Sequence, residues 1–242
     1  WHTHRYPGIR SDSDLYTFGY RFKPWTGDPI ASADKILNYM EEVIEDNDLD
    51  RHIRYGHKIV SADWSKDDAL WTVHAVRVDT GEELRFTTNF LWMCQGYYRH
   101  DQGYTPDWPD MEKFKGEIVH PQTWPEDLDY KGKKVIVIGS GATAATLVPA
   151  IAGDCEHVTL LQRSPTYIAT VPERDELSVK LRRFLPEMVV YRMARARNIG
   201  LQRLVYRLSQ QRPGLVRRAL LAAARRQLGD EVDMKHFRPS YN

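Results

Sequence analysis

Residues 135–144 indicate the fold most directly, and they read Val135-Ile136-Val137-Ile138-Gly139-Ser140-Gly141-Ala142-Thr143-Ala144. Its four aliphatic residues do not alternate with polar ones, which is typical of a parallel strand covered on both faces. The six residues that follow fit the pattern G-x-G-x-x-A, in which a strand turns directly into a helix. We therefore predict an α/β fold organised around this strand, turn and helix.

A second strand completes the unit. His157 to Leu161 forms the next apolar run, so Lys134 to Gln162 makes a strand–helix–strand unit of about thirty residues. Glycines in such a turn let the backbone approach a pyrophosphate, and the start of the helix offers unpaired N–H groups and partial positive charge. The predicted dinucleotide-binding residues of the turn are Gly139, Ser140, Gly141, Ala142, Thr143, Ala144 and Ala145.

The end of the second strand bears on the choice between NAD and NADP. An acidic residue there hydrogen-bonds a free ribose hydroxyl. Here Arg163 and Ser164 follow the strand, and a guanidinium beside a hydroxyl suits a 2′-phosphate. We predict NADPH as the nucleotide, although Arg163 could instead be a solvated residue at the strand end.

Upstream of this unit, the chain reads as a loop, a helix and a set of strands. The segment up to Pro29 is rich in Tyr, Pro, Gly and Asp, and a helix with one apolar face begins after Ser32. Strands are predicted at 57–64, 70–78 and 82–88 as an antiparallel meander. The apolar run Phe90 to Cys94 suits a buried strand that opens onto a ligand.

Composition excludes several classes of protein. The chain has 242 residues, with 34 Lys and Arg against 33 Asp and Glu, so no overall charge predicts a nucleic-acid partner. Cys94 and Cys155 lack paired spacing and predict neither a disulfide framework nor a metal site. No apolar run approaches the ~20 residues that span a bilayer. These features favour a cytoplasmic protein.

The connector before the glycine turn carries a more specific motif. In FKGEIVHPQTWPED, five residues match F-x-G-x-x-x-H-x-x-x-W-P at every defined position. The pattern resembles the fingerprint of type I Baeyer–Villiger monooxygenases, and RYPGIRSDSD, CQGYY and LLQRSPTY are similar to other stretches of that family. HPQTWPEDLDY and QRSPTYI most resemble its ethionamide-activating, FAD-containing branch. The fingerprint residues are Phe114, Gly116, His120, Trp124 and Pro125.

The resemblance implies a flavoprotein with two dinucleotide-binding domains, in which a Rossmann-like NADP domain is inserted in an FAD domain. It implies FAD and NADPH as cofactors, and O2 with a small ketone or sulfide as substrates. His120 and Trp124 would lie at the hinge between the domains. Arg10, Ser11 and Asp12 would lie where nicotinamide meets flavin, with Asp12 orienting a catalytic arginine, and Trp1 and Ile59 would contact the flavin. Asp12 could equally be a turn residue.

The same resemblance implies a partial fold. Residues 1–129 would form part of the FAD domain and the connector, 130–172 the NADP-binding unit, and 173–242 a helical insertion. The flavin's own glycine turn would precede Trp1 and the catalytic arginine would follow Asn242, so we expect this piece alone to be inactive. An NADP-binding module without catalysis, or an inactive remnant, is the alternative.

The arginine-rich helical stretch from Arg192 to Arg226 has two interpretations. A basic amphipathic helix can lie on an anionic membrane. Alternatively, the stretch is a helix pair with a solvated charged face, interrupted at Pro213-Gly214. We favour the helix pair.

Overall fold

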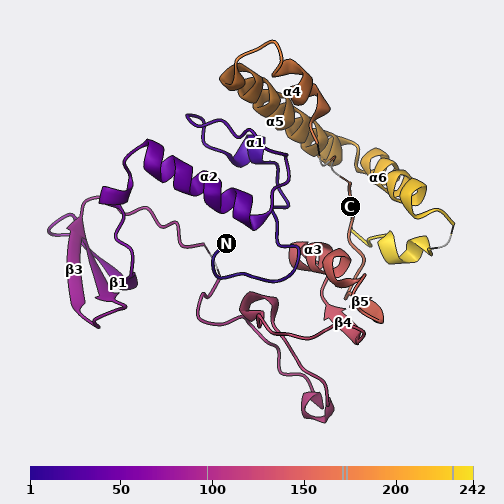
Figure 1. Cartoon of the computed structure of the whole chain (residues 1–242), viewed down its shortest axis with the longest axis horizontal. Helices are drawn as coiled ribbons and strands as arrows, with labels where there is room; N and C mark the ends of the chain where they lie inside the picture. The colour runs from indigo at the N-terminus through magenta and orange to yellow at the C-terminus, as the bar shows by residue number, and fades with distance from the viewer. Residues whose placement is uncertain (97, 171, 173, 231, 242) are drawn as a thin grey trace. The chain divides into compact units, whose positions relative to one another are not determined.

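Two units make up the chain in the computed structural model, which describes residues 1–96, 98–170, 172, 174–230 and 232–241 (Figure 1). The first unit comprises Trp1–Tyr39 and Tyr104–Asn242, and the second comprises Met40–Gly103. The boundary falls within helix α2 (Ala33–Asp46), which begins directly after Ser32 as predicted. These units do not follow the predicted boundaries at 129/130 and 172/173, which remain a prediction. Glu173 and Asn242, the two ends of the predicted insertion, lie outside the described residues.

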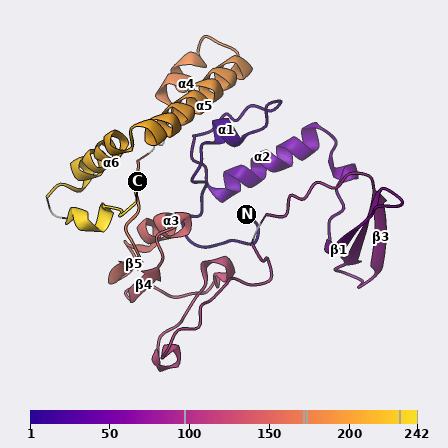
Figure 2. The ribbon, with the colours of Figure 1, turned by 180° about the vertical axis from the view of Figure 1, so that it is seen from behind.

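The second unit is an antiparallel meander (Figure 2). A short 3-10 helix, η1 (Asp50–His52), precedes strands β1 (His57–Ser65), β2 (Leu70–Arg77) and β3 (Glu83–Thr88), in the order β1-β2-β3. In β2, Val73 and Ala75 are buried and His74 between them is exposed, which is the period-2 pattern of a sheet with one covered face. The predicted meander is confirmed.

The predicted strand at Phe90 to Cys94 is wrong. This segment has no regular structure, and Phe90 and Trp92 are 74% and 78% exposed. A buried strand needs hydrogen-bonding neighbours, and no described residue pairs with this segment. Apolar composition alone therefore misidentified it.

The first unit contains the predicted strand–helix–strand. Strand β4 (Lys134–Ile138) pairs in parallel with β5 (His157–Leu161), and helix α3 (Ala142–Ile151) crosses between them. Leu147 and Ile151 form the buried side of α3. One expectation is wrong: Ile136 and Ile138 are 61% and 55% exposed, so within the described residues helix α3 covers only one face of the sheet.

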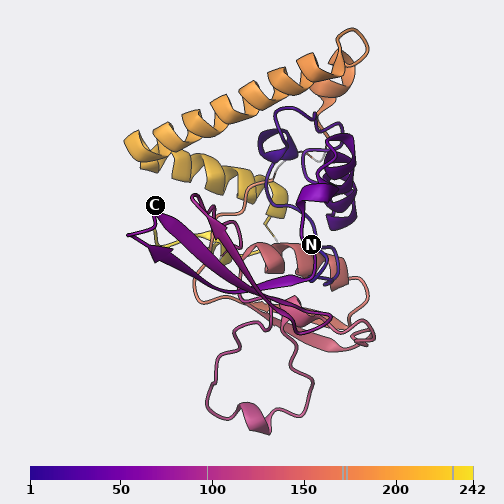
Figure 3. The ribbon, with the colours of Figure 1, turned by 90° about the vertical axis from the view of Figure 1, so that its left-hand side faces the viewer.

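The other regular elements described in the first unit are helices, joined by long irregular segments (Figure 3). The short α1 (Leu15–Phe18) packs on α5 (Glu187–Gln211), which also contacts α4 (Glu176–Leu181) and α6 (Pro213–Leu228). Two fully buried side chains of the core, Tyr16 and Tyr191, come from α1 and α5. A final 3-10 helix, η4 (Met234–Phe237), contacts α6. Among the described helices, none has the length and hydropathy needed to cross a lipid bilayer.

Candidate functional site

The glycine turn lies between β4 and α3. Gly139 has a φ of 113°, a conformation that a residue with a Cβ rarely adopts, and its N–H donates to the carbonyl of Leu161 at 2.8 Å. Gly141 precedes the first residue of α3 and provides no side-chain cap. Ala144 is only 6% exposed, because α3 packs against the two strands at this point. The three small residues thus have the positions that the motif predicts.

The start of α3 fits a phosphate group. A Cβ on Gly139 or Gly141 would have no heavy atom within 4 Å, so open space adjoins the turn on the side where a side chain would project. Helix geometry leaves the N–H groups of Ala142, Thr143 and Ala144 without partners inside the helix. Donors at a helix start, next to open space, are the arrangement that binds anions. The turn can therefore accommodate a pyrophosphate.

Arg163 follows β5 at the same edge of the parallel pair. Its side chain is exposed and has no hydrogen-bond or ion-pair partner in the described part of the chain. The neighbouring Gln162 donates its side-chain amide to the carbonyl of His236 in η4 at 2.8 Å, which ties the strand end to the last helical turn. Arg163 thus follows a residue that is tied to η4, and its guanidinium is available to an anion.

The N-terminal loop packs directly on α3. Gly8 has a φ of 73°, and a Cβ there would lie 2.7 Å from Cβ of Ala150 and 3.2 Å from the carbonyl oxygen of Thr146. No other residue fits this approach without displacing the backbone. The loop that contains Arg10, Ser11 and Asp12 is therefore held on the helix that follows the glycine turn.

Two hydrogen bonds with Ala31 hold Ser11 in place. Its N–H donates to the carbonyl of Ala31 at 2.7 Å, and its hydroxyl accepts from the N–H of Ala31 at 3.0 Å. Arg10 forms an isolated bridge with Ser32, and its side chain is exposed. The carboxylate of Asp12 accepts a hydrogen bond from the hydroxyl of the adjacent Ser13 at 3.1 Å, a contact typical of a turn. Its side chain is nevertheless exposed to solvent.

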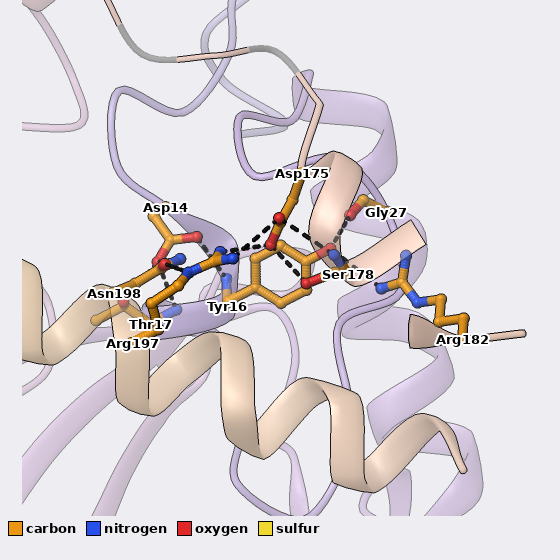
Figure 4. Close-up of polar contacts among 9 residues, drawn as sticks. All are labelled: Asp14, Tyr16, Thr17, Gly27, Asp175, Ser178, Arg182, Arg197 and Asn198. Atoms are coloured by element: carbon orange, nitrogen blue, oxygen red, sulfur yellow. Dashed lines mark hydrogen bonds and ion pairs between the residues drawn. The ribbon is translucent and has the colours of Figure 1, made fainter. Parts of the chain in front are cut away.

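Asp14 connects this loop to the helical segment, a link that sequence reasoning missed. The carboxylate accepts from the backbone N–H groups of Tyr16 and Thr17, which caps α1. It also accepts from the side-chain amide of Asn198 in α5 at 3.0 Å. Figure 4 shows both sets of contacts converging on Asp14. Because 184 positions separate Asp14 from Asn198, no local motif could have revealed the pair.

A second set of contacts extends the link (Figure 4). Asp175 caps α4 through Ser178 and forms an ion pair with Arg197. Burial alone would raise the pKa of the Asp175 carboxyl, but hydrogen bonds from Arg197 and Ser178 outweigh it and lower the pKa from 3.8 to about 2. Arg182 donates to the hydroxyl of Tyr16 at 3.1 Å, although burial raises the pKa of that phenol overall.

The fingerprint follows one 3-10 helix, η2 (Met111–Lys113), and contains a second, η3 (Pro121–Thr123). The ring of Phe114 lies over Gly116, so a Cβ on that glycine would be 2.5 Å from the ring. Nδ1 of His120 accepts from the N–H of Gln122 at 3.2 Å and so caps η3. His120 thus has a satisfied structural contact, which is compatible with the predicted hinge position.

Trp124 lines an open cavity of about 360 Å³ beside the N-terminal loop. Its ring meets that of Tyr130 in a T-shaped contact, with centroids 6.0 Å apart. Arg5 and Glu126, which also line the cavity, form an ion pair. Pro125 is half-buried next to Trp124. The cavity is therefore lined both by the end of the fingerprint and by the N-terminal loop that leads to Arg10.

The remaining predicted residues are placed individually. Trp1 is 45% exposed in the first unit, and Ile59 is 55% exposed next to a bulge in β1 of the second unit. Ser164 is half-buried after β5. Cys94 and Cys155 are free thiols, and no group of His, Cys, Asp and Glu in the described residues could hold a metal ion.

Comparison with known proteins gives a consistent result. The sequence model of the family described as "Flavin-binding monooxygenase-like" matches residues 29–181. The chain is 50% identical to a probable FAD-binding monooxygenase, AlmA, of Acinetobacter baylyi, and 50% identical to the FAD-containing monooxygenase EthA of Mycobacterium tuberculosis. Both alignments cover 100% of this chain, with 49% of AlmA and 50% of EthA. The chain spans about half the length of these curated relatives.

Solved structures share the fold. The chain is 32% identical to an NADP+-bound cyclohexanone monooxygenase from Rhodococcus sp. Phi1, with a TM-score of 0.56 over 72% of this chain and 33% of that one. It is 30% identical to OTEMO in complex with FAD and NADP, with a TM-score of 0.55 over 69% of this chain and 32% of that one. These matches confirm the predicted α/β flavoprotein fold, of which the chain covers a part.

Proposed function

Because this chain belongs to the flavin-binding monooxygenase-like family, we propose that the protein containing it uses NADPH, FAD and O2 to transfer one oxygen atom to a small organic substrate. The family assignment confirms the predicted resemblance. The proposed substrate is a ketone, oxidised in a Baeyer–Villiger reaction, or a sulfide. The likeness to a cyclohexanone monooxygenase supports the ketone.

One observation carries the proposal: an uncapped helix start next to the open glycine turn, followed at the end of the next strand by the guanidinium of Arg163, which has no partner among the described residues. The N–H groups at the start of α3 would hold the pyrophosphate of NADPH. Arg163, with the hydroxyl of Ser164, would bind the 2′-phosphate that distinguishes NADPH from NADH. NADP bound in two of the similar structures supports this assignment.

The flavin part of the proposal relies on the N-terminal loop. FAD, when bound, supplies a hydride acceptor and the electrons that activate O2. In this chain, Trp1 and Ile59 would contact the flavin, and Arg10, Ser11 and Asp12 would border its meeting point with the nicotinamide. The packing of Gly8 on α3 and the two bonds between Ser11 and Ala31 would hold Arg10, Ser11 and Asp12 in place relative to the glycine turn. Asp12 would orient a cationic partner through its exposed carboxylate.

The experiment uses the full-length, FAD-loaded protein. NADPH should bleach the visible absorption of the flavin faster than NADH does, and Arg163→Asp should weaken NADPH binding about 100-fold, with little effect on NADH. Arg51→Asp, which makes the same charge change at an exposed site in η1, is the matched control. Binding of NADPH without bleaching would favour an NADP-binding module, and an unchanged nucleotide preference in Arg163→Asp would remove the role of Arg163.

A further inference from the structure

Positive charge is concentrated in one part of the chain. Residues 188–229, which include most of α5 and all of α6, contain ten arginines and no acidic residue. The chain as a whole has a formal net charge of only +1. A solvated helix pair of ordinary composition would mix both signs of charge along its surface. The segment therefore departs from the pattern expected of a helix that faces only water.

Six of these ten arginines have no partner among the described residues. Arg195 and Arg197 bond to the N-terminal loop and to Asp175, and Arg217 and Arg225 also have partners. The other six are exposed, and their side chains make no hydrogen bond or ion pair to any described residue. They are Arg192, Arg203, Arg207, Arg212, Arg218 and Arg226. Six like charges gathered without counter-charges would be stabilised by an anionic surface.

Apolar side chains occur among the same arginines. We call residues 200–218, where α5 ends and α6 begins, the α5–α6 tip (Figure 3). Every residue from Gly200 to Arg207 is exposed, and Leu201, Leu204 and Leu215 are each more than half exposed. At about 100° per residue, Leu201, Leu204, Val205 and Leu208 share one side of α5. Arg192, Arg203 and Arg207 fall on the opposite side.

We propose that the α5–α6 tip docks on an anionic lipid surface. A helix with an apolar stripe and a basic opposite face lies in the plane of a bilayer interface, with its apolar side chains below the headgroups and its cations beside the lipid phosphates. Arginine and lysine stems reach the headgroup level from such a position. Nucleic acid would pair with the arginines but would leave the leucines in water, so the apolar stripe favours lipid.

The test is co-sedimentation of the full-length protein with vesicles. The protein should pellet with vesicles of phosphatidylcholine plus phosphatidylglycerol, stay in solution with phosphatidylcholine alone, and be released by high salt. R203Q/R207Q should lower the vesicle partition constant roughly 30-fold, because each basic residue near an anionic surface contributes about 1 kcal/mol, which is about a five-fold change. L201Q/V205Q should lower it at every salt concentration and leave its dependence on salt unchanged.

The control variant R51Q/K58Q removes two exposed positive charges from the second unit and should bind vesicles like the wild type. Thermal melting of each variant checks that the fold is retained. Three results would overturn the proposal: no binding of the full-length protein to anionic vesicles, an equal loss in R203Q/R207Q and R51Q/K58Q, or retention on duplex DNA with no retention on vesicles.

Discussion

The guanidinium of Arg197 donates two hydrogen bonds to the carboxylate of Asp175, from Nη1 to Oδ1 at 3.1 Å and from Nη2 to Oδ2 at 2.5 Å. The side chain of Asp175 is only 8% exposed, whereas that of Arg197 is 41% exposed. The pair joins α5 to the start of α4, and the adjacent Asn198 bonds to Asp14 in the N-terminal loop. Asn198 therefore links α5 to the loop that carries Arg10, Ser11 and Asp12, and the adjacent Arg197 holds the start of α4 at the same place on α5.

Removal of Arg197 should destabilise the protein. Arg197→Gln leaves a largely buried carboxylate without its ion partner, and because Arg197 is itself partly solvated we expect a loss of about 2 kcal/mol in the free energy of unfolding. Urea unfolding followed by circular dichroism measures the change. Arg203→Gln, an exposed arginine on the same helix, is the control and should change stability by less than about 0.5 kcal/mol. Equal effects would contradict a role for the pair.

The contribution of Asp175 should depend on pH. Its folded pKa of about 2 lies below the ordinary value of 3.8, so its ionised form stabilises the fold above about pH 4. That stability, about 2 kcal/mol, is lost as pH falls from about 4 towards 2. The difference in unfolding free energy between wild type and Arg197→Gln should therefore narrow over this interval. A difference that stays constant down to pH 2 would show that the carboxylate is not the group concerned.

Substitution at Gly8 should disrupt the contact between the loop and α3. Gly8→Ala incurs both the cost of a positive φ and a clash with Ala150 and Thr146, for which we expect about 2–4 kcal/mol. Gly81 has the same φ of 73° but open space around it, so Gly81→Ala should cost only about 1 kcal/mol. Thermal or urea unfolding of the two variants separates strain from packing. Equal losses would mean that the close approach contributes nothing.

A methyl group at Gly141 should affect nucleotide binding and not folding. Gly141 has a φ of −78°, and its Cβ would enter open space, so Gly141→Ala should change stability by less than about 0.5 kcal/mol. The same methyl group would occupy the approach to the pyrophosphate and should weaken NADPH binding by about tenfold or more. Gly153→Ala, in the turn after α3, also places its Cβ in open space and is the control. Unchanged NADPH affinity in Gly141→Ala would place the phosphate elsewhere.

Local sequence was sufficient to predict the parts of the fold that depend on neighbouring residues. The turn from Ile138 to Ala142 follows from the conformational freedom of its glycines, and the three-stranded meander follows from alternation and short turns. The fingerprint from Phe114 to Pro125 was sufficient to identify the family, because its spacing is read along one short segment.

Which distant groups meet became known only from the three-dimensional packing. Asp14 with Asn198, and Gly8 with Ala150, are pairs far apart in sequence. Taken alone, Asp14 is typical of a helix cap and Gly8 of a turn, and neither residue indicates its distant partner. Apolar runs were equally ambiguous: Val135 to Ile138 is a strand with one exposed face, and Phe90 to Cys94 is no strand. Burial and pairing depend on surfaces supplied by other segments. A local pattern states what a segment can bury, whereas long-range packing decides what covers it.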